Sequence, residues 1–370
     1  MRLGILTFHW ATNYGAILQA YALQTYLQKM GHVVYIINYR PGRYKKFILK
    51  CFYTKRFWLI PDNVIDYIKE KRLEVFRKKY FNETILYESL EELEKNPPKF
   101  DAYICGSDQI WNPSFTTNGE GGPTPVYFLS FGDKKVKRIA YAISFGCENY
   151  PGTAGKIAKE YMPGLDAISV RENSGISILS KLGINDAQVL PDPTLLLESN
   201  DYSFDKVSDV SPKKRAFIYI LRKENKIVRD IVGHIENEYS IERPNKAFNI
   251  YSVEDWANSI KNASLVVTNS YHGMLFSIIN HVPFTVILSE GKAACMNDRF
   301  ISLLNYLGLQ KRALSKFDSK RFNSILDDNI DWGLIDTHVE VLKDRTRIFF
   351  KETLHGLNPS DYGKNIITAN

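Results

Sequence analysis

Short apolar runs alternate with stretches of helical periodicity from the first residues of the chain onward. Arg2 to Phe8 is an apolar run, and the capping pair Thr12 and Asn13 follows it. Apolar residues then recur at the spacing of one helix face, at Ala16, Ala20, Leu23, Leu27 and Met30. Gly31 ends this helix, and Val33 to Asn38 is the next apolar run. The order strand, helix, strand predicts a βαβ unit, and such units build parallel sheets covered by helices.

The same alternation continues in two series, which predicts two sheets. The first series adds strands over residues 102–105, 139–144, 167–170 and 188–190. The second has strands over 216–221, 247–250, 265–268 and 284–288, and helices over 226–238, 254–262, 273–280 and 300–307. Ser252 and Asp255 form a capping signature for the helix over 254–262. A stretch rich in Pro, Ser and Asp, residues 189–215, is expected to connect the two series.

This pattern predicts an α/β fold of two Rossmann-like domains that face each other across a cleft. We expect an N-terminal domain over residues 1–198 and a C-terminal domain over 199–335. The last segment, 336–370, contains a helix over 339–354 that is expected to pack back on the N-terminal domain. Ligands of such sheets bind at the carboxyl ends of the strands, so candidate chemistry is sought there.

Composition excludes several classes of protein. With 370 residues, 44% of them hydrophobic and 24% charged, the chain can bury the cores of two domains, and disorder is not expected. The four cysteines lie far apart without a CxxC pair, which argues against a zinc site and a disulfide scaffold. No apolar run reaches the roughly 18 residues that a membrane span needs, so a cytoplasmic protein is expected.

The net charge of +7 is concentrated in one segment, residues 40–80. Between Arg40 and Lys79 the chain has thirteen basic and four acidic residues, a surplus larger than that of the whole chain. Within it, KKFILKCFYTKRFWLI mixes basic residues with large aromatics. This mixture suits an anionic membrane surface and also a nucleic acid, while a covered contact between domains or subunits is the simpler alternative.

The loop after the first strand is a candidate anion site. Asn13, Tyr14 and Gly15 stand where backbone amides and the positive end of a helix dipole would point at a ligand. The loop has no GxGxxG pattern, which disfavours a dinucleotide enzyme. A tight turn and a helix cap explain Asn13 and Gly15 equally well.

Two further candidates follow strands of the first series. Ser107 and Asp108 come directly after the strand over 102–105, where Asp108 can hold a sugar hydroxyl, act as a base or cap a helix. Arg171 ends the strand over 167–170. Its guanidinium matches a carboxylate or phosphate, and the alternative is an ion pair with Glu172 or another acid.

The sharpest candidate lies in the second series. Asn269-Ser270-Tyr271-His272-Gly273 joins an apolar strand to an apolar helix, and the helix N-terminus disfavours the protonated ring of His272, which keeps it available for proton exchange. A structural histidine is the alternative. The other six histidines form no metal-ligand spacing with His272, so no metal is expected. Lys292 and Arg299, in and after the next loop, can either reach an anion or remain ordinary solvated charges.

Together these segments resemble the polysaccharide pyruvyl transferases. The matching pieces are GILTFHWATNYGAILQAYALQTYL, ICGSDQIWN, SVRENSG, VLPDPTLLL, VVTNSYHGMLFSIINHVPF and NDRFISLLNYLGL, which span residues 1 to about 310 in order. The resemblance implies a fold similar to two-domain glycosyltransferases of the B type. It also implies transfer of pyruvate from phosphoenolpyruvate to two hydroxyls of a sugar as a ketal, with release of phosphate and without a metal or other cofactor.

The resemblance assigns roles to individual residues. His272 matches the family's active-site histidine, hypothesised as proton donor or relay, and Arg171 matches its strand-end arginine. Arg299 or Lys292 matches the later basic contacts to the donor. Ser270 stands where many members have arginine, so Lys292, Arg299 or Arg171 has to supply that charge. The amides of Asn13 to Gly15 would bind ligand, and Asp108 would bind the acceptor.

The domains and partners follow from the same resemblance. The N-terminal domain would form the acceptor side and the C-terminal domain the donor side. The expected partners are phosphoenolpyruvate and a sugar or lipid-linked oligosaccharide of surface or capsular polysaccharide biosynthesis, and no nucleic acid. The basic aromatic segment would then hold the protein at the inner face of an anionic membrane. Two alternatives are a glycosyltransferase that uses a nucleotide sugar and a non-catalytic protein that binds carbohydrate or an anion.

Overall fold

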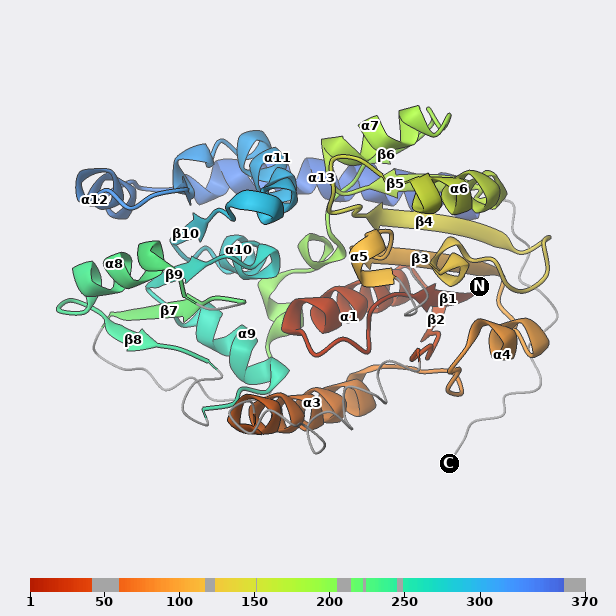
Figure 1. The fold of residues 1–370 in the computed structure, drawn as a ribbon, viewed down its shortest axis with the longest axis horizontal. Helices are drawn as coiled ribbons and strands as arrows, with labels where there is room; N and C mark the ends of the chain where they lie inside the picture. Colours follow the sequence, from red (N-terminus) through yellow and green to blue (C-terminus); the bar gives the residue numbers. More distant parts are fainter. Residues whose placement is uncertain are drawn as a thin grey trace. The chain divides into compact units, whose positions relative to one another are not determined.

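The chain folds into two compact α/β units (Figure 1). The computed structural model describes residues 1–41, 60–116, 124–150, 152–204, 214–221, 224–244 and 249–355. Unit 1 comprises Met1–Tyr67, Glu74–Leu196 and Leu342–Asn370, and unit 2 comprises Ile68–Leu73 and Leu197–Val341. Two long helices contain residues of both units: α3 (Ile60–Tyr80) and α13 (Trp332–Leu354).

Unit 1 is built on a parallel sheet of six strands in the order β2-β1-β3-β4-β5-β6. The strands are β1 (Arg2–Leu6), β2 (Val33–Ile36), β3 (Ala102–Asp108), β4 (Lys137–Ile143), β5 (Ala167–Val170) and β6 (Gln188–Val189). The central strands β3 and β4 are almost wholly buried because a parallel sheet is covered on both faces. Since all strands run in one direction, the loops after β1, β3, β4, β5 and β6 meet at one edge of the sheet.

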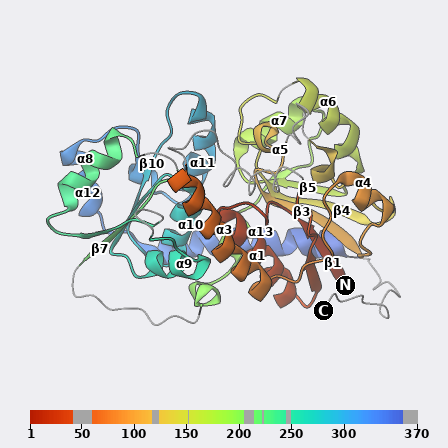
Figure 2. The ribbon, with the colours of Figure 1, turned by 60° about the horizontal axis from the view of Figure 1, so that its bottom comes forward.

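Helices cover both faces of this sheet. They are α1 (Tyr14–Lys29), α4 (Leu90–Lys95), α5 (Pro113–Thr116), α6 (Gly152–Tyr161) and α7 (Asn173–Lys181), with the 3₁₀ helices η2 (Pro125–Phe128), η3 (Met162–Gly164) and η4 (Pro193–Leu196). Figure 2 shows α6 and α7 on one side of the strands and α1 on the other. On the α1 side, the ring of Phe350 in α13 packs against Tyr26 of α1 and Tyr141 of β4, with centroids 6.2 and 4.9 Å apart.

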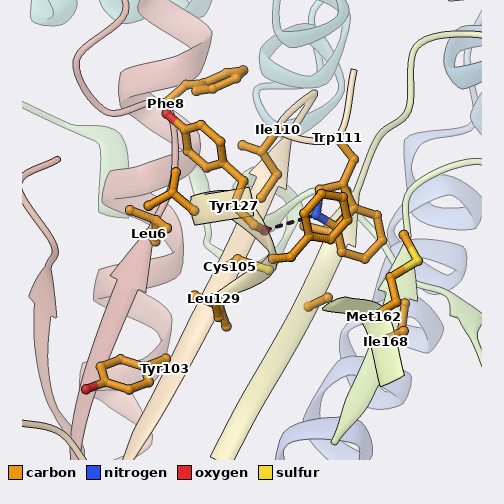
Figure 3. Packing of buried hydrophobic residues seen from close by; sticks show 14 of the residues in the cluster. Leu6, Phe8, Tyr103, Cys105, Ile110, Trp111, Tyr127, Leu129, Met162 and Ile168 are labelled. Carbon is orange, nitrogen blue, oxygen red and sulfur yellow. Dashed lines mark hydrogen bonds between the residues drawn. The ribbon is translucent and has the colours of Figure 1, made fainter. Parts of the chain in front are cut away.

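Trp111 lies at the centre of the core on the opposite face (Figure 3). Its indole is fully buried, stacks on Phe128 at 5.2 Å and donates from Nε1 to the carbonyl of Tyr127 at 3.0 Å. The hydrogen bond satisfies the single polar group of the side chain, so the large ring can be buried without an unpaired donor. Trp111 belongs to the segment between β3 and α5, so its burial anchors this segment.

Unit 2 has a parallel sheet of five strands in the order β11-β10-β9-β7-β8. The strands are β7 (Arg215–Tyr219), β8 (Ser240–Glu242), β9 (Leu265–Thr268), β10 (Phe284–Ile287) and β11 (Ala313–Leu314). The helices are α8 (Lys226–Ile235), α9 (Val253–Lys261), α10 (Tyr271–Ile279), α11 (Asp298–Tyr306) and α12 (Ser319–Leu326), with the 3₁₀ helices η5 (Ser199–Tyr202), η6 (Gly291–Asn297) and η7 (Gln310–Arg312).

The helices of unit 2 pack through two separate sets of side chains. Ile231 of α8 and Phe322 of α12 belong to a core cluster with residues of β7, β9, β10 and β11. Trp256 of α9 packs against Tyr219 and against Phe276 of α10, with ring centroids 5.3 and 5.2 Å apart. These rings join α9 to β7 and α10, and α10 is buried from Tyr271 to Ile278.

The observed elements agree with the predicted alternation. The helix after β1 begins behind the predicted cap Asn13, and Ser252 and Asp255 form the predicted capping box of α9. The strand predicted over 247–250 lies partly outside the described residues and stays a prediction, whereas β8 lies at Ser240–Glu242, where no strand was predicted. The connecting stretch expected over 189–215 begins with buried residues, since η4 belongs to unit 1. Among the helices of the described ranges, none is both long and apolar enough to cross a membrane.

Candidate functional site

The carboxyl ends of β1, β3 and β4 are tied together by buried polar groups. Gln19 of α1 donates from Nε2 to Thr7 Oγ1 at 2.8 Å, and its Oε1 accepts from the amide of Ser107 at 3.0 Å. Thr7 Oγ1 donates to the carbonyl of Ser107 at 3.1 Å, and Ser107 Oγ donates to the carbonyl of Ala142 at 2.6 Å. The hydroxyl and the amide of Ser107 are thereby used inside the protein, and this geometry favours a structural role over the predicted binding of substrate.

Asp108 follows this ladder in a conformation that few residues adopt. Its φ is 75°, in the left-handed region, and its backbone carbonyl accepts from the amide of Ser144 at 3.0 Å. The preceding Gly106 has a φ of 120°, and a Cβ there would lie 2.1 Å from the carbonyl oxygen of Tyr141. Only glycine fits that approach. Because β3 contacts β4 so closely, the Asp108 carboxylate lies at the carboxyl end of the strands. Its Oδ1 accepts from the amide of Gln109 at 2.9 Å.

Arg171 lies among three carboxylates at the same edge. Its side chain has no exposed surface; Nη1 is 2.6 Å from Asp192 Oδ2, Nη2 is 3.6 Å from Asp108 Oδ1 and Nε is 3.8 Å from Glu172 Oε2. The structure therefore brings Asp108 and Arg171 together. A guanidinium that is already countered by acids favours the ion-pair alternative over the predicted clamp for an anionic ligand.

Asp192 is the residue at this edge that sequence reasoning missed. The VLPDPTLLL segment carries it, but its proline-rich character pointed to a connection between domains. The signal that could have revealed it is an acidic residue between two prolines inside an otherwise apolar run, because an acid so placed requires a buried partner. That partner, Arg171, lies 21 positions earlier in the chain.

The loop after β1 uses its candidate residues for capping. Asn13 Oδ1 accepts from the amides of Gly15 at 2.8 Å and Ala16 at 3.2 Å, and Tyr14 is fully buried as the first residue of α1. The amide of Gly15 already has a partner in the protein. For Asn13, Tyr14 and Gly15 the geometry favours the turn-and-cap alternative.

His9 in the same loop is a buried histidine that the sequence did not single out. Burial lowers its pKa to about 3, assisted by the nearby guanidinium groups of Arg40 and Arg77. Its Nδ1 lies 3.2 Å from the carbonyl of Thr7 and its Nε2 lies 3.3 Å from Asn38 Oδ1. The ring is neutral at neutral pH, so its 3.8 Å approach to Glu83 is not an ion pair. His9 holds the loop rather than exchanging protons.

Two cations of the basic segment 40–80 also belong to this region of unit 1. Arg77 is fully buried and donates to the carbonyls of His9 at 2.8 Å and Ala11 at 3.1 Å, while Arg40 contacts Glu74 and Glu83. Burial favours the neutral acid of Glu74, but Arg40 and Arg77 outweigh it and lower the pKa of that carboxyl. These two arginines are thus committed to ion pairs. The aromatic part of the segment, residues 42–59, lies outside the described residues.

His272 lies in the first turn of α10, at the carboxyl end of β9. Ser270 caps this helix by accepting from the amide of Gly273 at 3.3 Å, and Thr268 Oγ1 accepts from the amide of Ser270 at 2.9 Å. A Cβ on Gly273 would lie 2.7 Å from Thr268 Oγ1, so glycine lets the helix start close against its strand. His272 is 6% exposed, at the positive end of a nine-residue helix.

Arg299 of α11 belongs to the same region of unit 2. Its guanidinium carbon lies 5.4 Å from the ring centroids of both Tyr271 and Phe300, and Tyr271 packs edge to face on Phe300. The structure therefore brings Arg299 next to the residue that precedes His272. Asn297 exchanges two hydrogen bonds with the backbone of Ser289, which closes the loop that carries Lys292. The side chain of Lys292 itself lies outside the described part of the structure.

The candidate residues thus lie in two regions. Ser107, Asp108 and Arg171 lie at the sheet edge of unit 1. In unit 2, Ser270 and His272 lie at the start of α10, and Arg299 packs over Tyr271 between them. Among the described residues, no group of three or more His, Cys, Asp or Glu side chains could hold a metal ion.

Solved structures with the same fold include the S. aureus MnaA-UDP co-structure, with a TM-score of 0.52 and 12% identity over 98% of this chain and 99% of that one. Weaker likenesses are a UDP-GlcNAc 2-epimerase from Neisseria meningitidis bound to UDP-GlcNAc, with a TM-score of 0.48, 11% identity and coverage of 94% and 100%, and the spinosyn rhamnosyltransferase SpnG, with 0.47, 12% and coverage of 96% and 100%. The predicted fold class, two Rossmann-like domains similar to the glycosyltransferase B type, is confirmed. The cleft expected between them stays a prediction.

No curated protein matches the sequence of this chain. The family model described as polysaccharide pyruvyl transferase matches residues 13–290, which includes Asp108, Arg171 and His272. Because this match covers well over half of the 370 residues, the protein belongs to the polysaccharide pyruvyl transferase family.

Proposed function

We propose that this transferase moves pyruvate from phosphoenolpyruvate onto two hydroxyls of a sugar as a ketal and releases phosphate. The observation that carries the proposal is the buried His272 at the N-terminus of α10, with Arg299 held against the adjacent Tyr271. A histidine can give and take a proton near neutral pH, and an arginine offers paired donors to a carboxylate or a phosphate. These are the two kinds of group that an enolpyruvyl phosphate needs.

The reaction requires one proton transfer to carbon and two attacks by oxygen. In our proposal His272 delivers or relays a proton to the methylene carbon, which becomes the methyl group, and the adjacent carbon becomes cationic. One sugar hydroxyl attacks this carbon and loses its proton. The second hydroxyl then bonds to the same carbon and loses its proton, while the bond between this carbon and the phosphate oxygen breaks. The hydroxyls release two protons and the methylene carbon takes up one, so phosphate leaves with one proton. Arg299 and Lys292 would stabilise the carboxylate and the phosphate.

Electrostatics supports a division of substrates between the two units. Among the described residues, three carboxylates surround the guanidinium of Arg171, so this cluster carries an excess of negative charge. Such a cluster repels a multiply charged anion but accepts neutral hydroxyl groups. Asp108 has the carboxylate with the most exposure of the three, 15% against 3% for Glu172 and 0% for Asp192. We therefore assign the acceptor to Asp108 in unit 1 and phosphoenolpyruvate to unit 2.

The donor and acceptor can be tested in one assay. Phosphate release from phosphoenolpyruvate is measured with free and lipid-linked galactose, mannose and glucosamine, for the wild type, His272→Ala and His234→Ala. His234 is the matched control, because it lies on α8 and its Nε2 pairs with Asn323. We expect acceptor-dependent release that falls by about 10²- to 10⁴-fold only in His272→Ala. Turnover unchanged by His272→Ala would show that this histidine is structural. Binding of a nucleotide sugar with no phosphate release from phosphoenolpyruvate would favour a glycosyltransferase, and sugar binding without turnover a non-catalytic protein.

We propose further that the reaction needs no metal or other cofactor. The proton, the cationic side chains and the leaving phosphate account for every step above. Turnover of the purified enzyme should therefore survive dialysis against a strong chelator. Loss of turnover that returns on addition of a divalent cation would contradict this part of the proposal.

A cytoplasmic protein that associates peripherally with the membrane is the proposal that fits a lipid-linked acceptor. The support is the basic aromatic composition of residues 42–59 and the exposed or partly exposed cations of α3 that follow, such as Lys71 and Lys78. Basic residues with aromatics favour anionic lipid surfaces. Flotation with vesicles should recover more protein on anionic than on neutral lipid, and less at high salt. Equal recovery on both would remove the idea.

A further inference from the structure

We infer that Asp192 is a positioning residue for the acceptor site, because it fixes Arg171 and Arg171 in turn orients the carboxylate of Asp108. The inference rests on the proposed function, in which Asp108 contacts the acceptor hydroxyls. It assigns a reason for the acid in the VLPDPTLLL segment, which neither the family match nor the proposed chemistry uses.

The first link is a rigidly held ion pair. Asp192 has no exposed surface, and its Oδ2 lies 2.6 Å from Nη1 of Arg171, whose side chain is also fully buried. The other carboxylate oxygen, Oδ1, accepts from the amide of Thr194 at 3.0 Å and from its hydroxyl at 2.8 Å. Both oxygens of Asp192 therefore have fixed donors, so the carboxylate presents one orientation to the guanidinium.

The second link runs from Arg171 to Asp108. The guanidinium lies 3.8 Å from Glu172 Oε2, and Glu172 Oε1 accepts from the amide of Phe145 at 3.2 Å, so a second anchored acid limits its position. The remaining nitrogen, Nη2, is 3.6 Å from Asp108 Oδ1. Asp108 is the member of this group that reaches solvent most. Asp108 Oδ1 also accepts from the amide of Gln109 at 2.9 Å. The orientation of this carboxylate thus depends both on that hydrogen bond and on where the two buried acids hold Arg171.

Removing the charge of Asp192 changes this balance without removing its shape. In Asp192→Asn the side chain can still accept from Thr194, but the buried guanidinium loses its closest counter-charge. A buried charge requires a partner, so Arg171 is drawn toward Asp108 and Glu172. The Asp108 carboxylate is then engaged more tightly by the protein and is less able to meet an acceptor hydroxyl. A displacement of about 1 Å at such a group costs about 10²-fold in rate.

The test compares Asp192→Asn with a matched variant at the opposite end of β5 from Arg171. Asp166 lies just before β5 and accepts from the amide of Arg138 at 2.8 Å, whereas Arg171 follows the other end of β5. We expect Asp192→Asn to reduce kcat/KM for the acceptor by about 10- to 100-fold and to leave KM for phosphoenolpyruvate unchanged. We expect Asp166→Asn, which alters a structural hydrogen bond at the opposite edge, to leave both parameters unchanged in folded protein.

A double-mutant cycle separates positioning from general structural damage. If Asp192 acts through Asp108, the double variant Asp192→Asn, Asp108→Asn is no slower than Asp108→Asn alone, because the group to be positioned is already lost. Multiplicative losses, or equal effects of Asp192→Asn on both substrates, would overturn the inference while leaving the proposed function standing. If Asp192→Asn fails to fold, Thr194→Val loosens Asp192 instead and should show a smaller change in the same parameter, and the same cycle with Asp108→Asn decides. A wild-type enzyme that releases no phosphate with any acceptor would overturn the proposed function and this inference together.

Discussion

The carboxyl-terminal edges of the two sheets carry different kinds of side chain. In unit 1, Asp108, Arg171 and Asp192 form a charged cluster whose members are tied to one another and to backbone. In unit 2, His272 lies at a helix N-terminus beside the ring of Tyr271, over which Arg299 packs. Under the proposed function, the first edge orients neutral hydroxyls, and the second binds an anion and supplies the proton. Such a division of substrates would depend on the loops of the fold.

The two histidines at strand ends make the same contrast at the level of single side chains. His9 of unit 1 is fully buried between hydrogen-bond partners, and burial lowers its pKa to about 3. His272 of unit 2 retains slight exposure in the first turn of its helix. A histidine of the first kind holds a loop in place. In the proposed mechanism, His272 is the group that transfers a proton.

The largest expected effect tests the division of substrates directly. Asp108→Asn should reduce kcat/KM for the acceptor by about 10²- to 10⁴-fold with KM for phosphoenolpyruvate unchanged. Arg299→Gln should do the reverse and raise KM for phosphoenolpyruvate by about 10- to 100-fold, because a charged hydrogen bond to the donor is lost. Steady-state kinetics with each substrate varied in turn gives both constants. Equal effects of each variant on the kinetic constants of both substrates would contradict the proposed division of substrates between the two units.

Glycine substitutions should distinguish the two edges in stability. Alanine at Gly106 would place its Cβ 2.1 Å from a backbone carbonyl in a residue with a φ of 120°, and we expect a loss of about 4 kcal/mol or more, or no folded protein. Alanine at Gly273 meets the side chain of Thr268 at 2.7 Å within a helix, so we expect a loss of only about 1 to 2 kcal/mol. Urea denaturation of both variants checks the order. A smaller loss for Gly106→Ala than for Gly273→Ala would contradict it.

The pH dependence of stability tests the structural role of His9. The folded ring has a pKa of about 3, below the ordinary histidine pKa of 6.5, so unfolded chains bind a proton that the folded protein does not. The contribution of His9 is fully present above pH 6.5 and is lost as the pH falls toward 3, by about 2 kcal/mol between pH 7 and pH 5. Comparing urea denaturation of the wild type and His9→Gln at both pH values isolates this contribution. An identical pH dependence in the two proteins would show that His9 is not buried in neutral form.

The smallest expected effects concern the two helix caps. Asn13→Ala and Ser270→Ala each remove a capping side chain and should cost about 1 kcal/mol of stability. Only Ser270→Ala should also slow phosphate release, because Ser270 positions the helix that carries His272. A loss of turnover in Asn13→Ala, measured under conditions where the protein stays folded, would indicate that the loop after β1 binds substrate.

The alternation of strands and helices could be predicted from the sequence because buried parallel strands form compact apolar runs. Residues at strand ends could also be predicted, and Asp108, Arg171 and His272 all lie there. The strand Ser240–Glu242 was missed because three residues with polar ends give no apolar signal. The partner of Arg171 could not be predicted either, since Asp192 becomes its neighbour only when β5 and β6 pair in the sheet.

The most direct measurement follows the proton that the account assigns to His272. The wild-type enzyme is incubated with phosphoenolpyruvate and its acceptor in D₂O, and the methyl group of the isolated product is examined by NMR. The account predicts a pyruvate ketal whose methyl group carries one deuterium from solvent, formed with release of phosphate and lost in His272→Ala but not in His234→Ala. A product that lacks the ketal, or a ketal whose methyl group forms equally well in His272→Ala, would contradict the central claim.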